Sequence, residues 1–497
     1  MFKKIMVANR GEIAKRIFTA CRELGVTSVA IYSDADAGSQ WIMSADEAYP
    51  LSGTTASESY LDQAKVIAIA QANGVEAIHP GYGFLSENAG FAEACATAGI
   101  KFIGPSPAAM RLMGSKASAR EVAQAAGVPV TPGVDGAGKS SAELQQAADE
   151  IGYPVLIKAS AGGGGKGMRV VEAAGDFLGA LQSARSEAAN SFGDDHIILE
   201  KYFTKIHHIE IQILGDEHGN VRHLFERECS IQRRHQKIIE ETPSPTIPDS
   251  VRQVIASAAV KLAQSAGYAS AGTVEFMYTG DGNFYLLEMN TRLQVEHPIT
   301  EWVTGHDLAQ WQIKIAAGMV LDVAQDAISQ RGHAIECRVY AEDPAQNFLP
   351  SIATATLVEF PVMPNVRTDA GIATGEAVTP YYDPMLAKVI VFGSTRAEAI
   401  DRMILALKQT IILGLTTNIP YMLDILQEED FRKGETTTNY LAEHFDGWKP
   451  SLTLTEDDLL AIAAVELLST GQKTAAGSGE AKQSFDPWNE PTAWRNR

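Results

Sequence analysis

Polar and apolar side chains alternate from Glu288 to Pro298. Polar residues occupy positions 288, 290, 292, 294 and 296, and Met289, Leu293 and Val295 lie between them. Successive side chains of an extended chain point to opposite faces, so the pattern predicts a strand with two carboxylates, two amides and a guanidinium on one face. That face offers oxygen ligands for a hard cation beside an Arg suited to an anion. The alternative is an edge strand with a solvated charged face, which the apolar run 284–287 before it disfavours.

The pattern near the amino terminus predicts a parallel α/β sheet. Residues 5–8 and 29–32 are short apolar runs, and between them apolar residues recur at the helical period. Strand, helix and strand in this order form a parallel unit, which residues 61–79 repeat. Ligands of such sheets bind beyond the carboxyl ends of the strands, so residues 9–10 and 79–87 are candidate site loops. Ordinary turn chemistry is the alternative for the glycines there.

Residues 159–167 form a glycine-rich loop between the apolar runs 154–158 and 168–171. Two flanking strands predict a hairpin, whereas the dinucleotide-binding fingerprint requires a helix after its glycines. The pattern therefore disfavours a nicotinamide-dependent dehydrogenase. Four consecutive glycines suit a flap whose backbone amides approach phosphate closely, and a flexible linker explains them equally well.

Two segments in the middle of the chain place polar groups close together. Residues 208–213 alternate strictly, which puts His208, Glu210 and Gln212 on one face of a predicted strand. Residues 229–237 concentrate cationic, imidazole and amide groups. Such a segment favours contact with an anion, and a solvated surface loop is the alternative.

A predicted hairpin brings two glutamates together. Glu275 lies on the apolar strand 273–277, and the turn at 280–282 joins this strand to the one that carries Glu288. Adjacent antiparallel strands of this kind place both carboxylates within reach of one cation. A bound metal then removes the penalty of burying a lone carboxylate.

The remainder of the chain is predicted to be helical, then β-rich, then helical. Helical periods continue from 303 to 317, and residues 332–392 form a β-rich portion in which Glu336, Arg338 and Tyr340 share a face. Residues 397–409 form an amphipathic helix, and folded material is expected to end near Trp448.

The last fifty residues combine a short helix with a tail. Thr455 is placed to cap a helix over 456–468, and residues 469–482 are rich in Gly, Ala and Ser, as is typical of linkers. Trp488 and Trp494 follow in a tail that either docks on a neighbouring surface or is disordered.

Composition narrows the function classes. Among 497 residues there are 41 basic and 61 acidic side chains, so the formal charge is −20, and the sequence contains no basic run that supports nucleic-acid binding. The four cysteines are far apart and show no metal or redox spacing, which indicates reduced thiols. No signal-peptide core and no apolar run of membrane-spanning length is found. These features predict a soluble, cytoplasmic protein.

Seven motifs, in their order along residues 1–447, resemble the biotin carboxylases, which are the ATP-grasp components of biotin-dependent carboxylases. The motifs are MVANRGEIAKRI at 6–17, HPGYGFLSEN at 79–88, FIGPSPAAMRLMGSK at 102–116, KASAGGGGKGMRVV at 158–171, ECSIQRRHQKIIEE at 228–241, EMNTRLQVEHPITE at 288–301 and ECRVYAEDP at 336–344.

The resemblance implies an α/β and α+β multidomain fold. A Rossmann-like N-terminal domain that precedes the ATP-grasp would span residues 1–114, and the ATP-grasp domain would span 115–330 with a mobile glycine-rich lid at about 131–204. A β-rich C-terminal biotin carboxylase domain would span 331–447. Residues 448–497 would add the helix, the linker and the Trp-containing tail.

The resemblance also implies a nucleotide site. Lys116 and Lys158 match lysines that hold the ATP phosphates, and Gly164 and Gly165 lie in the phosphate flap. The adenine hinge and the further nucleotide contacts correspond to Glu200, Lys201, Tyr202, Phe203, His208, Gln232, His235 and Lys237. Two Mg²⁺ or Mn²⁺ ions would be held by Glu275, Glu288 and Asn290.

The bicarbonate and biotin pocket is implied in the same way. The matched positions are Tyr82, Lys237, Arg292, Gln294, Val295, Glu296 and Arg338. Glu296 would act as the general base that deprotonates bicarbonate, Arg292 would hold the anion, Lys237 would neutralise the transferring phosphoryl group, and Arg338 would face the ureido oxygen of biotin. The implied activity is that of an ADP-forming carbon–nitrogen ligase, which makes carboxyphosphate from ATP and bicarbonate and carboxylates biotin.

Two rival classes share part of this pattern. Another ATP-grasp ligase that forms an acyl phosphate would need Lys116, Lys158, Glu275 and Glu288, but it would not require Arg292, Glu296 and Arg338 in one pocket. A non-catalytic scaffold would not require the metal ligands and the base.

No Met-Lys-Met biotinylation site occurs, and no carboxyltransferase region follows residue 448. The expected partners are therefore a separate biotin carboxyl carrier protein and carboxyltransferase subunits, and the resemblance implies a homodimer. The chain would catalyse the first half-reaction of an acetyl-CoA (in fatty acid biosynthesis), other acyl-CoA or pyruvate carboxylase. The sequence does not specify which acceptor is used.

Overall fold

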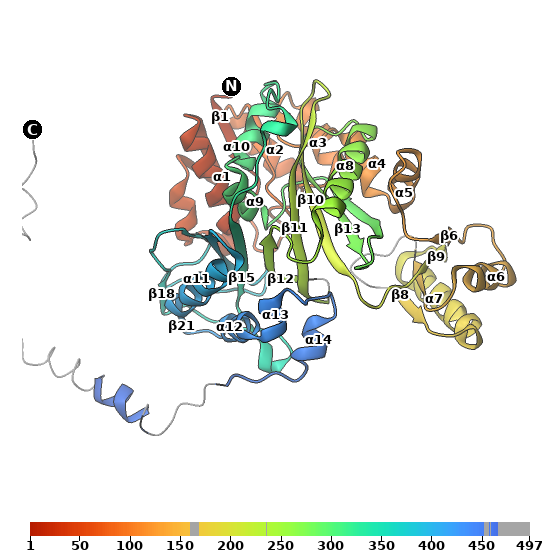
Figure 1. Ribbon diagram of the computed structural model, residues 1–497. Coiled ribbons are helices and arrows are strands. Elements are labelled where there is room, and N and C mark those ends of the chain that lie inside the picture. The colour runs from red at the N-terminus through yellow and green to blue at the C-terminus, as the bar shows by residue number, and fades with distance from the viewer. Residues whose placement is uncertain (160–167, 235, 452–456, 458, 466–497) are drawn as a thin grey trace, which may run out of the picture. The chain divides into compact units, whose positions relative to one another are not determined.

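The structure is a computed structural model that describes residues 1–159, 168–234, 236–451, 457 and 459–465 (Figure 1). The chain divides into two compact units, Met1–Trp448 and Lys449–Arg497. In the second unit residues 459–465 are helical, within the helix predicted for 456–468. Its predicted cap Thr455 and the two tail tryptophans, Trp488 and Trp494, lie outside the described residues.

A five-stranded parallel sheet begins the first unit, in the order β3-β2-β1-β4-β5. Its strands are β1 (Lys4–Val7), β2 (Thr27–Tyr32), β3 (Glu47–Pro50), β4 (Ala77–His79) and β5 (Lys101–Phe102). The helices in this part of the chain are α1 (Gly11–Glu23), α2 (Gln63–Ala72), α3 (Ala89–Thr97) and α4 (Pro107–Gly114). The predicted Rossmann-like α/β arrangement is confirmed.

An eight-stranded sheet forms the centre of the first unit (Figure 1). Its neighbouring strands pair antiparallel in the order β14-β13-β10-β11-β12-β15-β20-β19. Their bounds are β10 (His207–Gly215), β11 (Val221–Arg233), β12 (Gln236–Thr242), β13 (Ser270–Tyr278), β14 (Phe284–Asn290), β15 (His333–Tyr340), β19 (Val366–Ala370) and β20 (Met385–Gly393). The predicted β-rich C-terminal portion therefore continues the sheet that carries Glu275 and Glu288.

Helices cover this sheet. Figure 1 shows α8 alongside β10 and β11, and α11 beside β15. Helix α11 also packs against β20. The helices of this part are α8 (Asp249–Ser265), α9 (His297–Thr304), α10 (Leu308–Ala316), α11 (Arg396–Gln409), α12 (Ile419–Gln427), α13 (Glu429–Lys433) and α14 (Tyr440–His444). The small strands β16 (Glu342–Asp343) and β17 (Leu349–Pro350) pair with each other, as do β18 (Leu357–Glu359) and β21 (Ile411–Leu413). Short 3-10 helices span Asp34–Asp36, Gln40–Ser44, Ala174–Asp176, Gln325–Ala327 and Pro344–Gln346.

A separate four-stranded antiparallel sheet has the order β6-β9-β7-β8. It comprises β6 (Gly133–Asp135), β7 (Val155–Ala159), β8 (Met168–Val171) and β9 (Ile197–Lys201), and the nearby helices are α5 (Lys116–Ala125), α6 (Ser141–Ile151) and α7 (Phe177–Phe192). The predicted hairpin around the glycine-rich loop is confirmed, with Lys158 opposite Met168. The flap glycines Gly164 and Gly165 lie outside the described residues.

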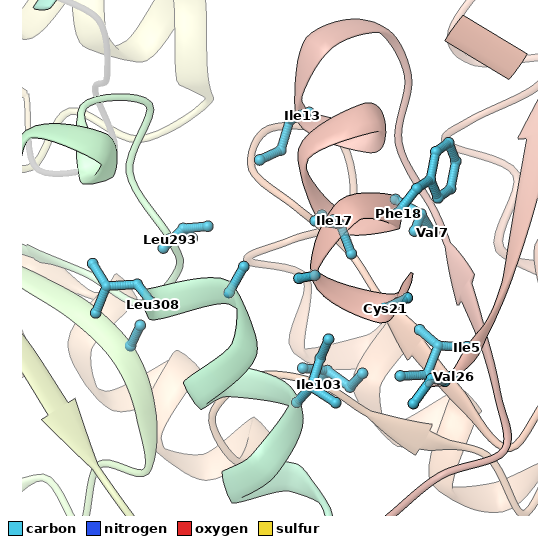
Figure 2. Packing of buried hydrophobic residues seen from close by; sticks show 14 of the residues in the cluster. Ile5, Val7, Ile13, Ile17, Phe18, Cys21, Val26, Ile103, Leu293 and Leu308 are labelled. Atoms are coloured by element: carbon cyan, nitrogen blue, oxygen red, sulfur yellow. The ribbon is translucent and has the colours of Figure 1, made fainter. Parts of the chain in front are cut away.

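One local prediction needs correction, and one alternative reading is excluded. The strand predicted for 288–296 ends at Asn290, and residues 291–296 form an irregular loop before α9. The chain leaves the sheet because Leu293 is buried in the core cluster of α1 and α10, where Figure 2 shows it near Leu308, and because Pro298 initiates α9. Residues 229–233 end β11 and residues 236–237 begin β12, with Gln232 opposite Lys237, so the surface-loop alternative is wrong for these residues.

Among the described residues no helix is long and apolar enough to cross a membrane.

Candidate active site

Lys237, near the start of β12, is the centre of a buried cluster of charges. Its Nζ donates hydrogen bonds to Glu210 at 2.5 Å, to Glu275 at 3.0 Å and to Glu296 at 2.6 Å. All four side chains are buried. Burial alone lowers the pKa of Lys237, but the three glutamates outweigh it and the pKa is raised well above its usual value. The ammonium is therefore charged, and it binds carboxylates from β10, β13 and the N-terminus of α9.

Glu296 directly precedes α9 and is fully buried. One carboxylate oxygen accepts from Lys237, and the other accepts from Arg338 at 2.8 Å. Burial raises the pKa of Glu296, but Lys237, Arg338 and Arg227 outweigh that effect and hold it well below its usual value. The surrounding cations thus keep this buried carboxylate ionised.

Arg338 on β15 bridges Glu296 to a second buried glutamate. Its Nε donates to Glu240 on β12 at 2.6 Å. Burial raises the pKa of Glu240 to about 7 in spite of Arg338, so this carboxyl group holds its proton more tightly than an exposed one. No local pattern in the sequence distinguishes Glu240, because its position opposite Glu336 depends on the pairing of β12 with β15.

Arg292 is held by three side chains although the segment is not a strand. Nη1 donates to Gln294 at 2.9 Å, Nη2 donates to Asn290 at 3.1 Å, and Nε donates to Glu87 at 3.0 Å. Gln294 in turn donates to Glu275 at 3.0 Å. The predicted convergence of these polar groups therefore holds, and it is produced by a compact loop instead of a strand face.

His208 and Gln232 lie beside the cluster. His208 Nε2 is 3.0 Å from Glu275, and Gln232 Nε2 is 3.2 Å from His208 Nδ1, an arrangement that fits a proton on Nε2. Burial lowers the pKa of His208, but Glu275 raises it, and the net shift is upward. His235, a further predicted contact, lies outside the described residues.

The predicted metal ligands also converge. Glu275 and Glu288 lie opposite each other on β13 and β14, and Asn290 Nδ2 donates to Glu275 at 2.8 Å. Displacement of water raises the pKa of Glu288, and the neighbouring carboxylates Glu275 and Glu87 raise it further. A divalent cation would relieve this repulsion, and two carboxylates with an amide are donors that suit Mg²⁺ or Mn²⁺ once the amide oxygen of Asn290 is turned toward it. The residues therefore fit the metal.

The other lysines predicted to bind the nucleotide are less buried than Lys237. Lys158 on β7 forms an ion pair with Glu200 on β9, and both are half-buried. Lys201 donates to the carbonyls of Gly152 and Tyr153 at 2.9 and 3.0 Å. Lys116 begins α5 and lowers the pKa of Glu288 by its charge.

Tyr202 and Phe203, in the segment predicted to be the adenine hinge, contact both sheets. The backbone N–H of Tyr202 donates to Pro154 at 3.1 Å, and Phe203 stacks on Tyr285 of β14 with ring centroids 5.2 Å apart. The hinge thus links the small sheet to the edge strand that carries Glu288.

The loop predicted to face the site, residues 79–87, contacts Asn9 at one end and Arg292 at the other. Asn9 Nδ2 donates to the carbonyls of Pro80 and Tyr82, each at 2.7 Å, and Glu87 contacts Arg292. The buried hydroxyl of Tyr82 has no hydrogen-bond partner among the described residues. Arg10 instead pairs with Asp36 at 2.7 Å, so it is not among the charges of the cluster.

Arg227 is a second functional candidate that sequence reasoning missed. It is fully buried on β11 and donates to Glu210 at 2.5 Å, to Gln212 at 2.7 Å and to Thr300 at 2.9 Å. Its cation offsets the surplus of carboxylates around Lys237. The alternation of β11 is the one sequence signal that could have indicated an inward-facing Arg.

An acidic antiparallel sheet, a smaller lysine-bearing sheet and a glycine hairpin between two strands together define an ATP-grasp enzyme. Family models agree with this class. Residues 1–110 match the biotin carboxylase N-terminal domain, residues 115–324 match the ATP-binding domain of the carbamoyl-phosphate synthase L chain, and residues 336–443 match the biotin carboxylase C-terminal domain.

Curated relatives extend over most of the chain. A pyruvate carboxylase component of Methanothermobacter thermautotrophicus is 50% identical over 447 residues, which are 90% of this chain and 91% of the relative. Biotin carboxylase 1 of Bacillus subtilis is 48% identical over 442 residues, which are 89% of this chain and 98% of the relative. The alpha subunit of the mitochondrial methylcrotonoyl-CoA carboxylase of Rattus norvegicus is 44% identical over 490 residues, which are 98% of this chain and 68% of the relative.

One solved structure resembles this chain in both sequence and fold. The biotin carboxylase domain dimer of Hydrogenobacter thermophilus 2-oxoglutarate carboxylase, in complex with MgADP, ADP and bicarbonate, is 47% identical with a TM-score of 0.85. The match covers 91% of this chain and 100% of that one. The chain belongs to the biotin carboxylase family.

Proposed function

We propose that this protein carboxylates biotin in an ATP- and bicarbonate-dependent, ADP-forming reaction. The observation that carries the proposal is Glu296, a buried and ionised carboxylate held between Lys237 and Arg338, with Arg292 on the same short loop. A base, an anion-binding guanidinium and a phosphate-neutralising ammonium are the groups that bicarbonate activation requires.

In the first step Glu296 accepts the proton of bicarbonate, whose oxygen attacks the γ-phosphorus of ATP to give carboxyphosphate and ADP. Arg292 holds the anion with its planar guanidinium, which Lys could not reproduce. Its contacts with Asn290, Gln294 and Glu87 fix the orientation of that guanidinium before the anion arrives. Lys237 stabilises negative charge on the phosphoryl group as it is transferred.

Nucleotide binding is assigned to residues of both sheets. Lys116 and Lys158 contact phosphate, residues 200–203 receive the adenine, and His208 and Gln232 lie beside the nucleotide. Glu275, Glu288 and Asn290 would hold Mg²⁺ or Mn²⁺, and the cation would neutralise negative charge on the phosphates.

In the second step carboxyphosphate yields CO₂ and phosphate, the phosphate takes the N1 proton of biotin, and the nitrogen bonds to CO₂. Arg338 stabilises the negative ureido oxygen that develops, and Tyr82 and Val295 line the biotin side of the pocket. A fixed cation of this kind acts without reorganisation at the moment when the charge develops.

The biotin is proposed to reside on a separate carrier protein, with carboxyltransferase subunits and a second copy of this chain completing a cytoplasmic complex. Names among the relatives support pyruvate or an acyl-CoA as the final acceptor, and one solved relative is a dimer. Acetyl-CoA, and with it fatty acid biosynthesis, is a narrower proposal of the same kind.

The test is an assay of ADP release by the purified full chain with free biotin. We expect release to require both bicarbonate and Mg²⁺, biotin to increase it, and ¹⁴C from bicarbonate to appear in carboxybiotin. ADP release without any dependence on bicarbonate would overturn the proposal and favour a different ATP-grasp ligase.

A further inference from the structure

The loop 291–296 carries Arg292 and Glu296, yet it pairs with no strand in the part of the chain that the structure describes. Leu293 anchors its middle in the core cluster of α1 and α10, and Figure 2 shows this side chain near Leu308. The N–H of Thr291 donates to Glu87 at 3.1 Å. Beyond Leu293, the carbonyl of Val295, directly before the base, accepts a hydrogen bond from Lys388 at 2.8 Å.

Lys388 lies on β20 opposite Arg338 and is fully buried. Its Nζ is 3.3 Å from Glu12 at the start of α1 and 3.8 Å from Asp369 on β19. The ammonium donates one hydrogen bond to the loop and forms ion pairs with a helix and a strand. Lys388 thus ties the Val295 carbonyl to two elements far away in sequence.

The surroundings keep Lys388 charged. Burial lowers the pKa of Lys388, but Glu12, Glu336 and Asp369 outweigh it and raise the pKa. Its ammonium is also 6.0 Å from the centre of the Tyr82 ring. Glu12 depends on this cation, because burial raises the pKa of Glu12 to about 7 while Lys388 lowers it.

From this geometry we propose that Lys388 is a positioning residue, which fixes the Val295–Glu296 peptide so that the base and the bicarbonate pocket keep their alignment. The inference rests on the proposed function of Glu296. The Lys388 side chain does not contact Glu296 directly, and its effect passes through the backbone carbonyl of Val295. A displacement of about 1 Å at a reacting group is sufficient to lower a rate ~10²-fold.

Lys388→Met tests this role, because Met has a similar length and no donor. We expect kcat for bicarbonate-dependent ADP release to fall by about 10²-fold, while the KM for ATP and the affinity for ADP remain unchanged. The matched control is Lys4→Met on β1, whose ammonium pairs with Glu47 far from the loop, and this variant should behave as the wild type.

A double variant separates positioning from charge balance. Lys388→Met removes the cation beside Glu12, Glu336 and Asp369, so the melting temperature of this variant should fall. Adding Glu12→Gln removes the nearer carboxylate of the two ion pairs and should restore part of the melting temperature, yet kcat should stay low because the Val295 carbonyl still lacks its donor. Glu12→Gln alone keeps the Lys388–Val295 bond and should retain most activity.

Recovery of kcat together with the melting temperature in the double variant would overturn the inference, and so would a wild-type kcat in Lys388→Met. If Lys388→Met accumulates only as aggregate, the double variant carries the same comparison. Failure of the proposed function is distinguishable, because the wild type itself would then show no bicarbonate-dependent ADP release.

Discussion

The eight-stranded and the four-stranded sheets hold their charged side chains differently. On the large sheet Lys237 and Arg338 are buried, and each binds two or more carboxylates, including Glu296. On the small sheet Lys158 and Glu200 are half-buried and pair with each other. Electrostatic interactions are stronger where water is excluded, so the large sheet fixes its charges and the small sheet leaves them exchangeable.

This difference indicates a division of labour. At the proposed bicarbonate end, Lys237, Arg338 and Arg292 already contact their protein partners before substrate arrives, which avoids reorganisation at the moment of reaction. At the nucleotide end Lys158 can leave Glu200 for a phosphate, since an ion pair of half-buried groups is weak. The following predictions test whether the two ends differ in this way.

The largest effect is expected from Glu296→Gln. The amide keeps the shape of the side chain but cannot accept the proton of bicarbonate, so bicarbonate-dependent ADP release should fall ~10²–10⁴-fold. ADP affinity, measured by calorimetry, should remain, because the small sheet is unchanged. Glu217→Gln, at an exposed pair with Lys101, is the control. Normal turnover in Glu296→Gln would refute the assignment of the base.

Arg338→Ala should separate the two half-steps. Without this guanidinium the ureido oxygen of biotin loses its stabilising cation, and formation of carboxybiotin should fall ~10²–10³-fold. Part of the bicarbonate-dependent ATP hydrolysis should survive, because Lys237 still contacts Glu296. Parallel measurement of ¹⁴C-carboxybiotin and of ADP tests this, and equal loss of both would show that Arg338 has a general structural role.

Lys158→Met should act on nucleotide binding. The loss of one charged hydrogen bond to phosphate removes about 1.5–3 kcal/mol, which raises the KM for ATP roughly 10- to 100-fold. The KM for bicarbonate should not change, since the buried cluster does not contain Lys158. Glu200→Gln removes the competitor of phosphate for Lys158 and serves as the counterpart, with a smaller effect. An equal rise in the KM for bicarbonate would contradict the proposed difference between the nucleotide end and the bicarbonate end of the site.

The smallest effect concerns stability at acid pH. Glu241 on β12 is buried, and although burial raises its pKa, Arg396 and His333 lower it from 4.5 to about 2. A depressed folded-state pKa stabilises the protein above the unfolded value, and this contribution is lost as the pH falls from about 4.5 to 2.

Glu241→Gln should therefore unfold at lower temperature at pH 7. Between pH 4.5 and 2 the unfolding free energy of the variant should also change less with pH than that of the wild type. The difference in slope should reach up to about 1.4 kcal/mol per pH unit. Thermal unfolding followed by circular dichroism checks this. An unchanged pH dependence would mean that the pair contributes nothing to the stability of the large sheet.

Local patterns predicted the parts of the fold that local physics determines. The hairpin with Glu275 opposite Glu288 follows from strand alternation and a Gly-Asp-Gly turn, and the glycine-rich hairpin follows from its two flanking apolar runs. The polar residues at 290, 292 and 294 were predicted to converge, and they do.

The features that the sequence did not reveal depend on contacts between distant segments of the chain. The strand predicted for 288–296 ends at Asn290 because Leu293 packs in a core that α1 and α10 supply, and alternation alone does not reveal that core. Glu240, Arg227 and Lys388 join the site through the order and register of the large sheet, which strand periodicity does not specify.

The most direct test is a crystal structure of this protein with MgADP and bicarbonate. The account predicts that Lys237 and Arg338 keep their contacts with Glu296, that bicarbonate lies between Arg292 and Glu296, and that Lys158 leaves Glu200 for a phosphate. A structure in which Glu296 has left both cations, or in which bicarbonate binds away from Arg292, would contradict a preassembled bicarbonate site.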